Sequence, residues 1–269
     1  MIDHAASPMS AIVALNADIL DDLERVRMAN EARLRSLFDP EWGKGVSREL
    51  AFEEVGRIEE LISAVKIQER DAIRHLEAAM RRHEIGGFVQ ATPGLGLKTV
   101  ARYLGAVGPL HARETVNQIY AYTGLHVVDG RAPRPTRGRR LGFSAEARKR
   151  AFCMAEPCIK AIGFSRTSKN GKVSHIARSP YRDVYEAGRA KYANSVARVD
   201  YVRYDKALRR QAVYLAAGEP LPDWLQHARA IRLVMKAIVG DLWVEARRAH
   251  DLPTGRRKPA EVELEAIAA

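Results

Sequence analysis

The stretch from Thr92 to Ala101 is the part of the chain whose residue types and spacing most directly suggest chemistry. It reads Thr-Pro-Gly-Leu-Gly-Leu-Lys-Thr-Val-Ala, so two glycines lie between a proline and a lysine. Proline ends a helix, and glycines allow a tight turn with exposed backbone. A second helix is expected to begin near Lys98 and to end at Gly108-Pro109. The pattern predicts the hairpin of a helix-hairpin-helix motif.

A hairpin of this kind is suited to binding a phosphate group. The first N–H groups of a helix have no partner inside the helix, and they favour an anion. The expected contact residues are Gly94, Gly96, Lys98 and Thr99, with Lys98 adding a point charge. The P-loop pattern and the third glycine of a dinucleotide fingerprint are both missing. Gly-x-Gly turns also occur in many unrelated folds, so a purely structural turn is the alternative.

The charge of the chain is concentrated in one segment. The 269 residues carry a net charge of +11, and residues 131–178 alone hold 13 basic and two acidic residues. Residues 1–86 hold 12 basic and 17 acidic residues. A block of one sign is typical of a polyanion-binding or disordered tract, with a solvated loop as the alternative. The cations expected to contact nucleic acid are Arg131, Arg134, Arg137, Arg139, Arg140, Arg148, Lys149 and Arg150.

The sequence suggests no cofactor, metal or membrane segment. Cys153 and Cys158 are separated by Pro157, and no Cys-x-x-Cys or nearby histidine pair completes a metal site. We expect two reduced thiols in the core. No signal peptide is visible, and no apolar run approaches the ~20 residues of a membrane helix. The expected location is the cytoplasm, associated with the nucleoid.

The long periodic segments predict a mostly α-helical protein. Residues 10–38 and a second helix capped by Ser47 carry apolar stripes interrupted by Asn30 and Glu69. We expect an antiparallel helical hairpin, or coiled-coil arm, over residues 1–86. This arm is the expected contact of a homo-oligomer, formed through residues 10–80.

A helical domain that contains the helix-hairpin-helix motif and a basic loop is expected to follow. Ser144 should cap a helix after the loop. The expected segments are the domain itself over 87–250, a mobile basic loop over 163–179, a helix from Ser179 to about Ala217, a last helix over 224–250 and a frayed tail over 251–269.

The order of these motifs resembles the C-terminal domain of the DEDD-type, bridge-RNA-guided insertion-sequence transposases. The turn is followed by Tyr-x-Tyr-x-Gly-Leu, the basic loop and Ser-Ala-Glu-Ala-Arg-Lys-Arg. Ser-Pro-Tyr-Arg and a final His-Ala-Arg-Ala-Ile-Arg helix ending in Asp-Leu-Trp come next. The resemblance covers roughly residues 84–250, and the preceding arm is similar to the family's coiled-coil linker. It implies a module for DNA recombination in a mobile element.

Two departures from the family bear on catalysis. Its RNase-H-like domain supplies four metal-binding carboxylates, whereas residues 1–86 are too short for that domain and show no strand-borne acids. The family's nucleophilic serine precedes a glycine, and Asp129-Gly130 stands where we would place that pair. Thr136 and Ser144 are the only hydroxyl residues between Gly124 and Arg150. Ser144 is a weak candidate nucleophile, better explained as a helix cap.

These observations predict a non-catalytic protein that binds double-stranded DNA through the turn and the arginine loop. One alternative is a serine recombinase or transposase subunit that needs a separate RNase-H-like partner. Another is an RNA-binding dimeric scaffold. His227, with Arg229 and Arg232, either faces phosphate or has a role inside the fold. No aromatic ladder is visible among the arginines, so the sequence does not specifically indicate single-strand stacking.

Overall fold

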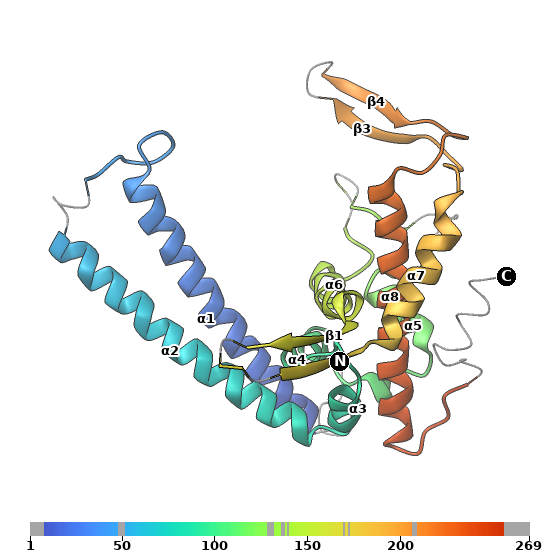
Figure 1. The fold of residues 1–269 in the computed structure, drawn as a ribbon, viewed down its shortest axis with the longest axis horizontal. Coiled ribbons are helices and arrows are strands. Elements are labelled where there is room, and N and C mark those ends of the chain that lie inside the picture. Colours follow the sequence, from blue (N-terminus) through green and yellow to red (C-terminus); the bar gives the residue numbers. More distant parts are fainter. Residues whose placement is uncertain are drawn as a thin grey trace. The chain divides into compact units, whose positions relative to one another are not determined.

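The computed structural model describes residues 8–47, 52–127, 132–135, 138, 140–168, 170–171, 173–205 and 209–255. This part of the chain is mostly helical, which confirms the predicted fold class. In order, the elements are α1 (Pro8–Phe38), α2 (Phe52–Arg82), α3 (Gly86–Ala91), α4 (Leu97–Val107), a 3-10 turn (Leu110–Ala112), α5 (Val116–Tyr122), α6 (Ala145–Lys160), β1 (Ile162–Thr167), β2 (Val173–Arg178), α7 (Pro180–Ala193), β3 (Tyr201–Asp205), β4 (Arg210–Leu215) and α8 (Asp223–Arg248) (Figure 1).

The chain divides into two compact units. The first combines residues 1–86 with residues 97–109, and the second combines residues 87–96 with residues 110–269. The first division lies between two adjacent glycines, Gly86 and Gly87. Helix α4 belongs to the first unit, although the sequence analysis placed its residues in the domain over 87–250.

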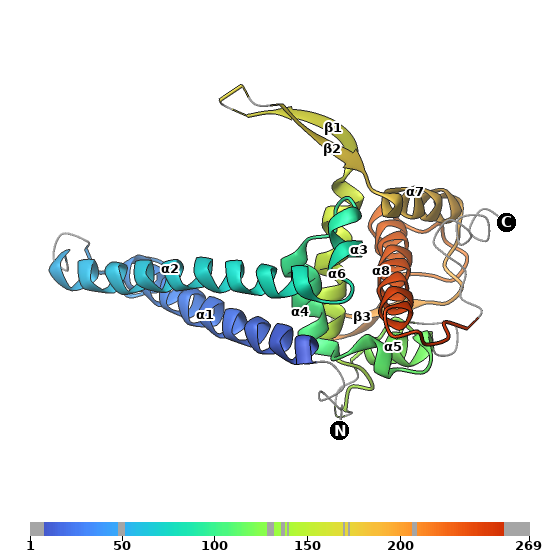
Figure 2. The ribbon, with the colours of Figure 1, turned by 90° about the horizontal axis from the view of Figure 1, so that it is seen from below.

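In the first unit, α1 and α2 run side by side and α4 packs against both (Figures 1 and 2). Val13, Ala17 and Leu20 of α1 are almost completely buried, whereas its Ile12, Leu15 and Ile19, on the stripe expected from the sequence, are exposed. Gly105 brings α4 close to α1, because a Cβ at this position would lie 3.0 Å from the Cβ of Ala17. Arg102 of α4 then forms a bidentate pair with Glu24 of α1, at 2.9 and 2.6 Å.

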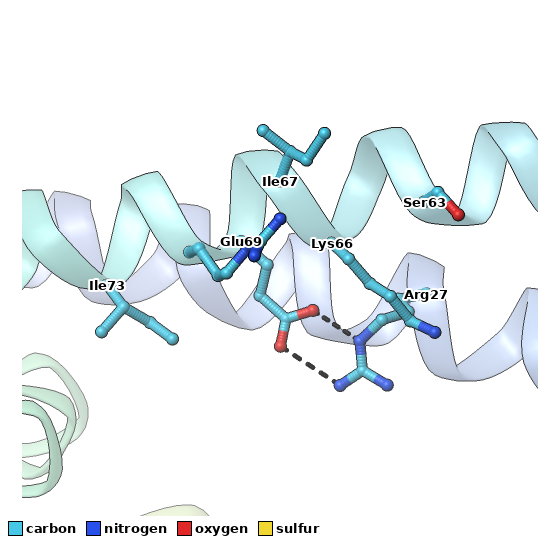
Figure 3. Close-up of a pocket in the computed structure, with 7 residues that line it drawn as sticks. Arg27, Ser63, Lys66, Ile67, Glu69 and Ile73 are labelled. Carbon is cyan, nitrogen blue, oxygen red and sulfur yellow. Dashed lines mark hydrogen bonds and ion pairs between the residues drawn. The ribbon is translucent and has the colours of Figure 1, made fainter. Parts of the chain in front are cut away.

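Ion pairs join the two helices of the hairpin at Glu69, the charged residue that interrupts the apolar stripe of α2 (Figure 3). Arg27 of α1 donates to both carboxylate oxygens of Glu69 on α2, at 2.5 and 3.2 Å. Arg27 also donates to Glu31 at 2.9 Å, and Lys66 lies 2.9 Å from the second oxygen of Glu31. Hydrogen bonding from Lys66 is the main reason that the pKa of Glu31 lies below its ordinary value. The polar interruption at Glu69 therefore joins α1 to α2.

The second unit is built on α8. Val234, Ile238 and Leu242 of α8 are fully buried, as their spacing of four residues requires. Helices α5, α6 and α7 all pack on α8. The hydroxyl of Tyr181 on α7 donates to Asp241 at 3.0 Å, and that of Tyr120 on α5 donates to the carbonyl of Lys236 at 3.0 Å.

Two expectations for this unit were wrong. Residues 163–179 do not form a loop, because β1 and β2 pair antiparallel with Ser165 opposite His175. The run Ile-Gly-Phe-Ser-Arg-Thr alternates as a strand does, and Gly171, at φ 71°, supplies the left-handed turn residue. The helix from Ser179 ends at Ala193 instead of continuing to Ala217. A second antiparallel hairpin, β3–β4, follows it, with Val202 opposite Val213.

Candidate nucleic-acid interface

The predicted turn is present between α3 and α4. Thr92 ends α3 by donating its hydroxyl to the carbonyl of Phe88 at 2.8 Å. The N–H of Leu95 donates back to the carbonyl of Thr92 at 3.2 Å, which closes the turn. Gly96 is exposed, and Lys98 and Thr99 are half-buried in the first turn of α4. Phosphate binding by these residues stays a prediction.

Gly94 has a packing role that the sequence did not reveal. Its φ is +90°, a region that favours glycine. A Cβ at this position would lie 2.7 Å from the Cα of Cys158 and 3.2 Å from its sulfur. The absence of a side chain therefore lets the turn press directly against α6.

The structure describes two of the five arginines in the basic loop. Arg134 and Arg140 are both exposed. The guanidinium carbon of Arg134 lies 5.5 Å from the centroid of the Tyr201 ring, within the range of a cation–π contact. Outside the described residues lie Arg131, Arg137, Arg139, Thr136 and the pair Asp129-Gly130.

The three cations of α6 that were expected to contact nucleic acid have different surroundings, and Arg148 belongs to the fold. Its guanidinium lies 4.0 Å from the centroid of the Phe143 ring. It donates to the carbonyl of Pro133 at 3.1 Å and to the carbonyl of Gly124. Burial lowers the pKa of Arg148 from its ordinary value. Arg148 therefore holds the base of the basic loop against the domain.

Arg150 and Lys149 both meet Glu146, but they differ in exposure. Arg150 is only 7% exposed and lies 2.6 Å from the carboxylate of Glu146. The side chain of Lys149 is 64% exposed and lies 3.8 Å from the same residue. Among Arg148, Lys149 and Arg150, Lys149 is therefore the one best placed to meet a ligand from solvent.

Ser144 is the N-cap of α6, as predicted. Its backbone is extended, and its hydroxyl oxygen accepts the N–H of Ala147 at 3.1 Å. This contact satisfies one of the free donors at the helix start. The arrangement gives Ser144 a structural role that needs no chemistry.

His227 and Arg232 make contacts inside the second unit. The Nδ1 of His227 lies 2.8 Å from the hydroxyl of Tyr185. Arg232 donates to the carbonyls of His126 and Gly124, at 2.7 and 3.2 Å. Burial lowers the pKa of Arg232 to about 10. Both side chains are thus engaged within the domain, like Arg148.

Sequence reasoning missed a cluster of arginines and aromatic rings beside the basic loop. Arg229 donates to the hydroxyl of Tyr201 at 2.8 Å, and its guanidinium carbon lies 5.5 Å from the centroid of the Tyr192 ring. The Tyr201 ring lies 6.1 Å from that of Tyr214, which lies 6.2 Å from that of Trp224. We call this set the Arg–aromatic cluster, and its members are Arg134, Tyr192, Tyr201, Tyr214, Trp224 and Arg229.

The chain matches no protein-family model, no curated protein and no solved structure. The resemblance to the transposase domain accordingly rests on the sequence motifs alone. Among the described residues, no helix combines the length and apolar character needed to cross a membrane.

Proposed function

We propose that this chain is a non-catalytic protein that binds double-stranded DNA through its second unit. The supporting observation is the contact of Arg134 with Tyr201, whose hydroxyl accepts from Arg229. It places a cation of the basic loop beside a cation of α8. Two guanidinium groups near one surface suit the closely spaced phosphates of a duplex.

The exposed loop cations are free of neutralising carboxylates within the described part of the chain. Neither Arg134 nor Arg140 forms an ion pair there, whereas Arg150 and Arg178 do. Arginines that meet solvent without a carboxylate partner are available to phosphate oxygens. Contacts of this kind supply affinity and carry no sequence information directly.

Two side chains that could supply a nucleophile, Ser144 and Cys158, are engaged structurally, which favours a non-catalytic role. The hydroxyl of Ser144 caps α6. Burial raises the pKa of Cys158 to about 12, so its thiol is protonated at neutral pH and is a poor nucleophile. Arg131, Arg137 and Arg139 enter the proposal through the sequence alone.

The test compares two triple variants with the same change in charge. The first replaces Arg134, Arg140 and Lys149 by alanine. The control replaces three arm residues, Arg25, Arg74 and Arg81, whose side chains are 73%, 76% and 51% exposed. Binding of a fluorescent blunt duplex is measured by anisotropy over a range of salt concentrations.

We expect the first variant to bind more weakly and to lose about 3 from its log–log salt slope, about 1 for each phosphate contact. The control should keep the wild-type slope. Equal losses in both variants would show that net charge alone governs binding and would contradict the proposed surface. An unchanged first variant would contradict it too.

A further inference from the structure

We infer that the Arg–aromatic cluster binds an unpaired base of single-stranded DNA, so that the chain's ligand is a duplex with an adjoining single strand. This inference rests on the proposed DNA-binding function and defines its substrate. In a duplex the faces of the bases are stacked on one another. An aromatic surface beside arginines can stack on a base and bind a phosphate at the same time only when the strand has unpaired bases.

The exposed end of the cluster is Trp224. This indole is 53% exposed and stacks on Tyr214, with 6.2 Å between ring centroids and 30° between ring planes. Tyr214 meets the edge of Tyr201 at 6.1 Å and 69°. The rings therefore form a continuous series that leads from Trp224 to Arg134 and Arg229.

A small core supports this series of rings. Tyr201 and Tyr214 pack against four buried residues. These residues are Ala197, Leu215, Leu221 and Leu225. Trp224 lies in the first turn of α8, which Arg189 holds through a 2.5 Å contact with Asp223. A ring held by its surroundings loses little conformational freedom when a base stacks on it.

The charges around the cluster favour an anionic ligand. Arg134 and Arg229 lie at its tyrosine end, within reach of a strand that passes over Tyr201. The nearby carboxylates already have partners. Asp223 pairs with Arg189, which lowers the pKa of Asp223, and Glu219 accepts the backbone N–H of Ala216 at 2.8 Å. A nucleotide matches both groups of the cluster, because its flat base can stack on the rings and its phosphate can bind the guanidinium groups.

Trp42 provides a contrast within the same chain. It is 88% exposed in the segment between α1 and α2, and its indole N–H donates to Glu41 at 3.2 Å. No ring contact involves Trp42 among the described residues. The third tryptophan, Trp243, is only 2% exposed. Replacing Trp42 by phenylalanine therefore leaves Trp224 as the accessible fluorophore.

The first experiment titrates the Trp42→Phe protein with a short oligothymidylate and records tryptophan fluorescence. Stacking on Trp224 should quench the emission. The Trp42→Phe, Trp224→Phe protein, which keeps only the shielded Trp243, should show no quenching. Emission that stays constant in the first protein would overturn the inference and would indicate that Trp224 faces a protein partner or solvent.

The second experiment compares a blunt duplex with the same duplex carrying a thymidine tail. The wild type and the Trp42→Ala control should bind the tailed duplex more tightly. Trp224→Ala should weaken tailed-duplex binding by roughly 5-fold to 150-fold. Trp224→Phe, which keeps a ring, should retain most of the affinity. Blunt-duplex binding should be the same in all four proteins.

The results separate this inference from the proposed function. Equal affinity of the wild type for blunt and tailed duplexes would overturn the base site while leaving duplex binding intact. Quenching by oligothymidylate without any binding of blunt duplex would overturn the duplex function and keep the base site. Thermal unfolding of Trp224→Ala and Trp224→Phe checks that a loss of binding comes from the missing ring.

Discussion

The guanidinium of Arg148 lies 4.0 Å from the centroid of the Phe143 ring, while one of its nitrogens donates to the carbonyl of Gly124. A cation from the most basic part of the chain is thus a structural element of the second unit. Its removal would take the Arg148 donor from the half-buried carbonyl of Pro133 and one of two donors from the buried carbonyl of Gly124, which also accepts from Arg232.

Arg148→Ala should therefore lower the free energy of unfolding by roughly 1–3 kcal/mol. Lys149→Ala, the matched control on the next residue, should change it by less than about 0.5 kcal/mol. Urea denaturation followed by circular dichroism measures both. Equal stability of the two variants would refute the structural role of Arg148.

Gly94→Ala should destabilise the protein because Gly94 combines a φ of +90° with close packing on Cys158. We expect a loss of roughly 2 kcal/mol or more in the free energy of unfolding. Gly87 is the control, since a Cβ there meets nothing within 4 Å and the residue lies in α3. Gly87→Ala should be neutral or stabilising by up to about 1 kcal/mol. A Gly94→Ala protein as stable as the wild type would contradict the packing.

Stability should fall at alkaline pH because of Cys158. Burial raises the pKa of its thiol from 9.0 to about 12. Between these values the folded thiol keeps its proton and the unfolded thiol loses it, so the free energy of unfolding decreases as pH rises through the window. Urea unfolding from about pH 8 to about pH 10.5 should show a smaller decrease for Cys158→Ala than for the wild type. Cys153→Ala should follow the wild type; parallel curves for all three proteins would contradict the assignment.

The Arg27–Glu69 pair should contribute more to stability than an exposed pair on the same helix. The side chains of Arg27 and Glu69 are 22% and 13% exposed, whereas those of Arg25 and Asp22 are 73% and 68% exposed. A double-mutant cycle to alanine should give a coupling of roughly 1 kcal/mol or more for the first pair. The second pair should give about 0–0.5 kcal/mol. Equal couplings would mean that burial does not strengthen the pair across the hairpin.

The sequence predicted the features that depend on local periodicity. The apolar stripe of residues 10–38 became α1, the final stripe became α8, and Ser144 caps α6 as its position before Ala145-Glu146 indicated. Residues 163–179 were predicted to be a loop because they are rich in polar residues and glycine. They contain most of the β1–β2 hairpin, whose strands are too short to give a clear alternation of apolar and polar residues.

The Arg–aromatic cluster could not be predicted because its members come from segments far apart in the chain. Arg134, Tyr192 and Trp224 belong to the basic loop, α7 and α8. They lie together only because hairpin β3–β4 places Tyr201 and Tyr214 between them. A count of charges also cannot distinguish Arg148 from Arg140. Arg148 packs on Phe143, whereas Arg140 is exposed.

The most direct test of the central proposal is the salt dependence of blunt-duplex binding by the wild-type chain. Of the eight cations predicted to contact nucleic acid in residues 131–150, six remain as candidates after Arg148 and Arg150 are assigned to the fold. They are Arg131, Arg134, Arg137, Arg139, Arg140 and Lys149. Six such contacts predict a log–log slope of about −5. A slope near zero would contradict DNA binding by this surface.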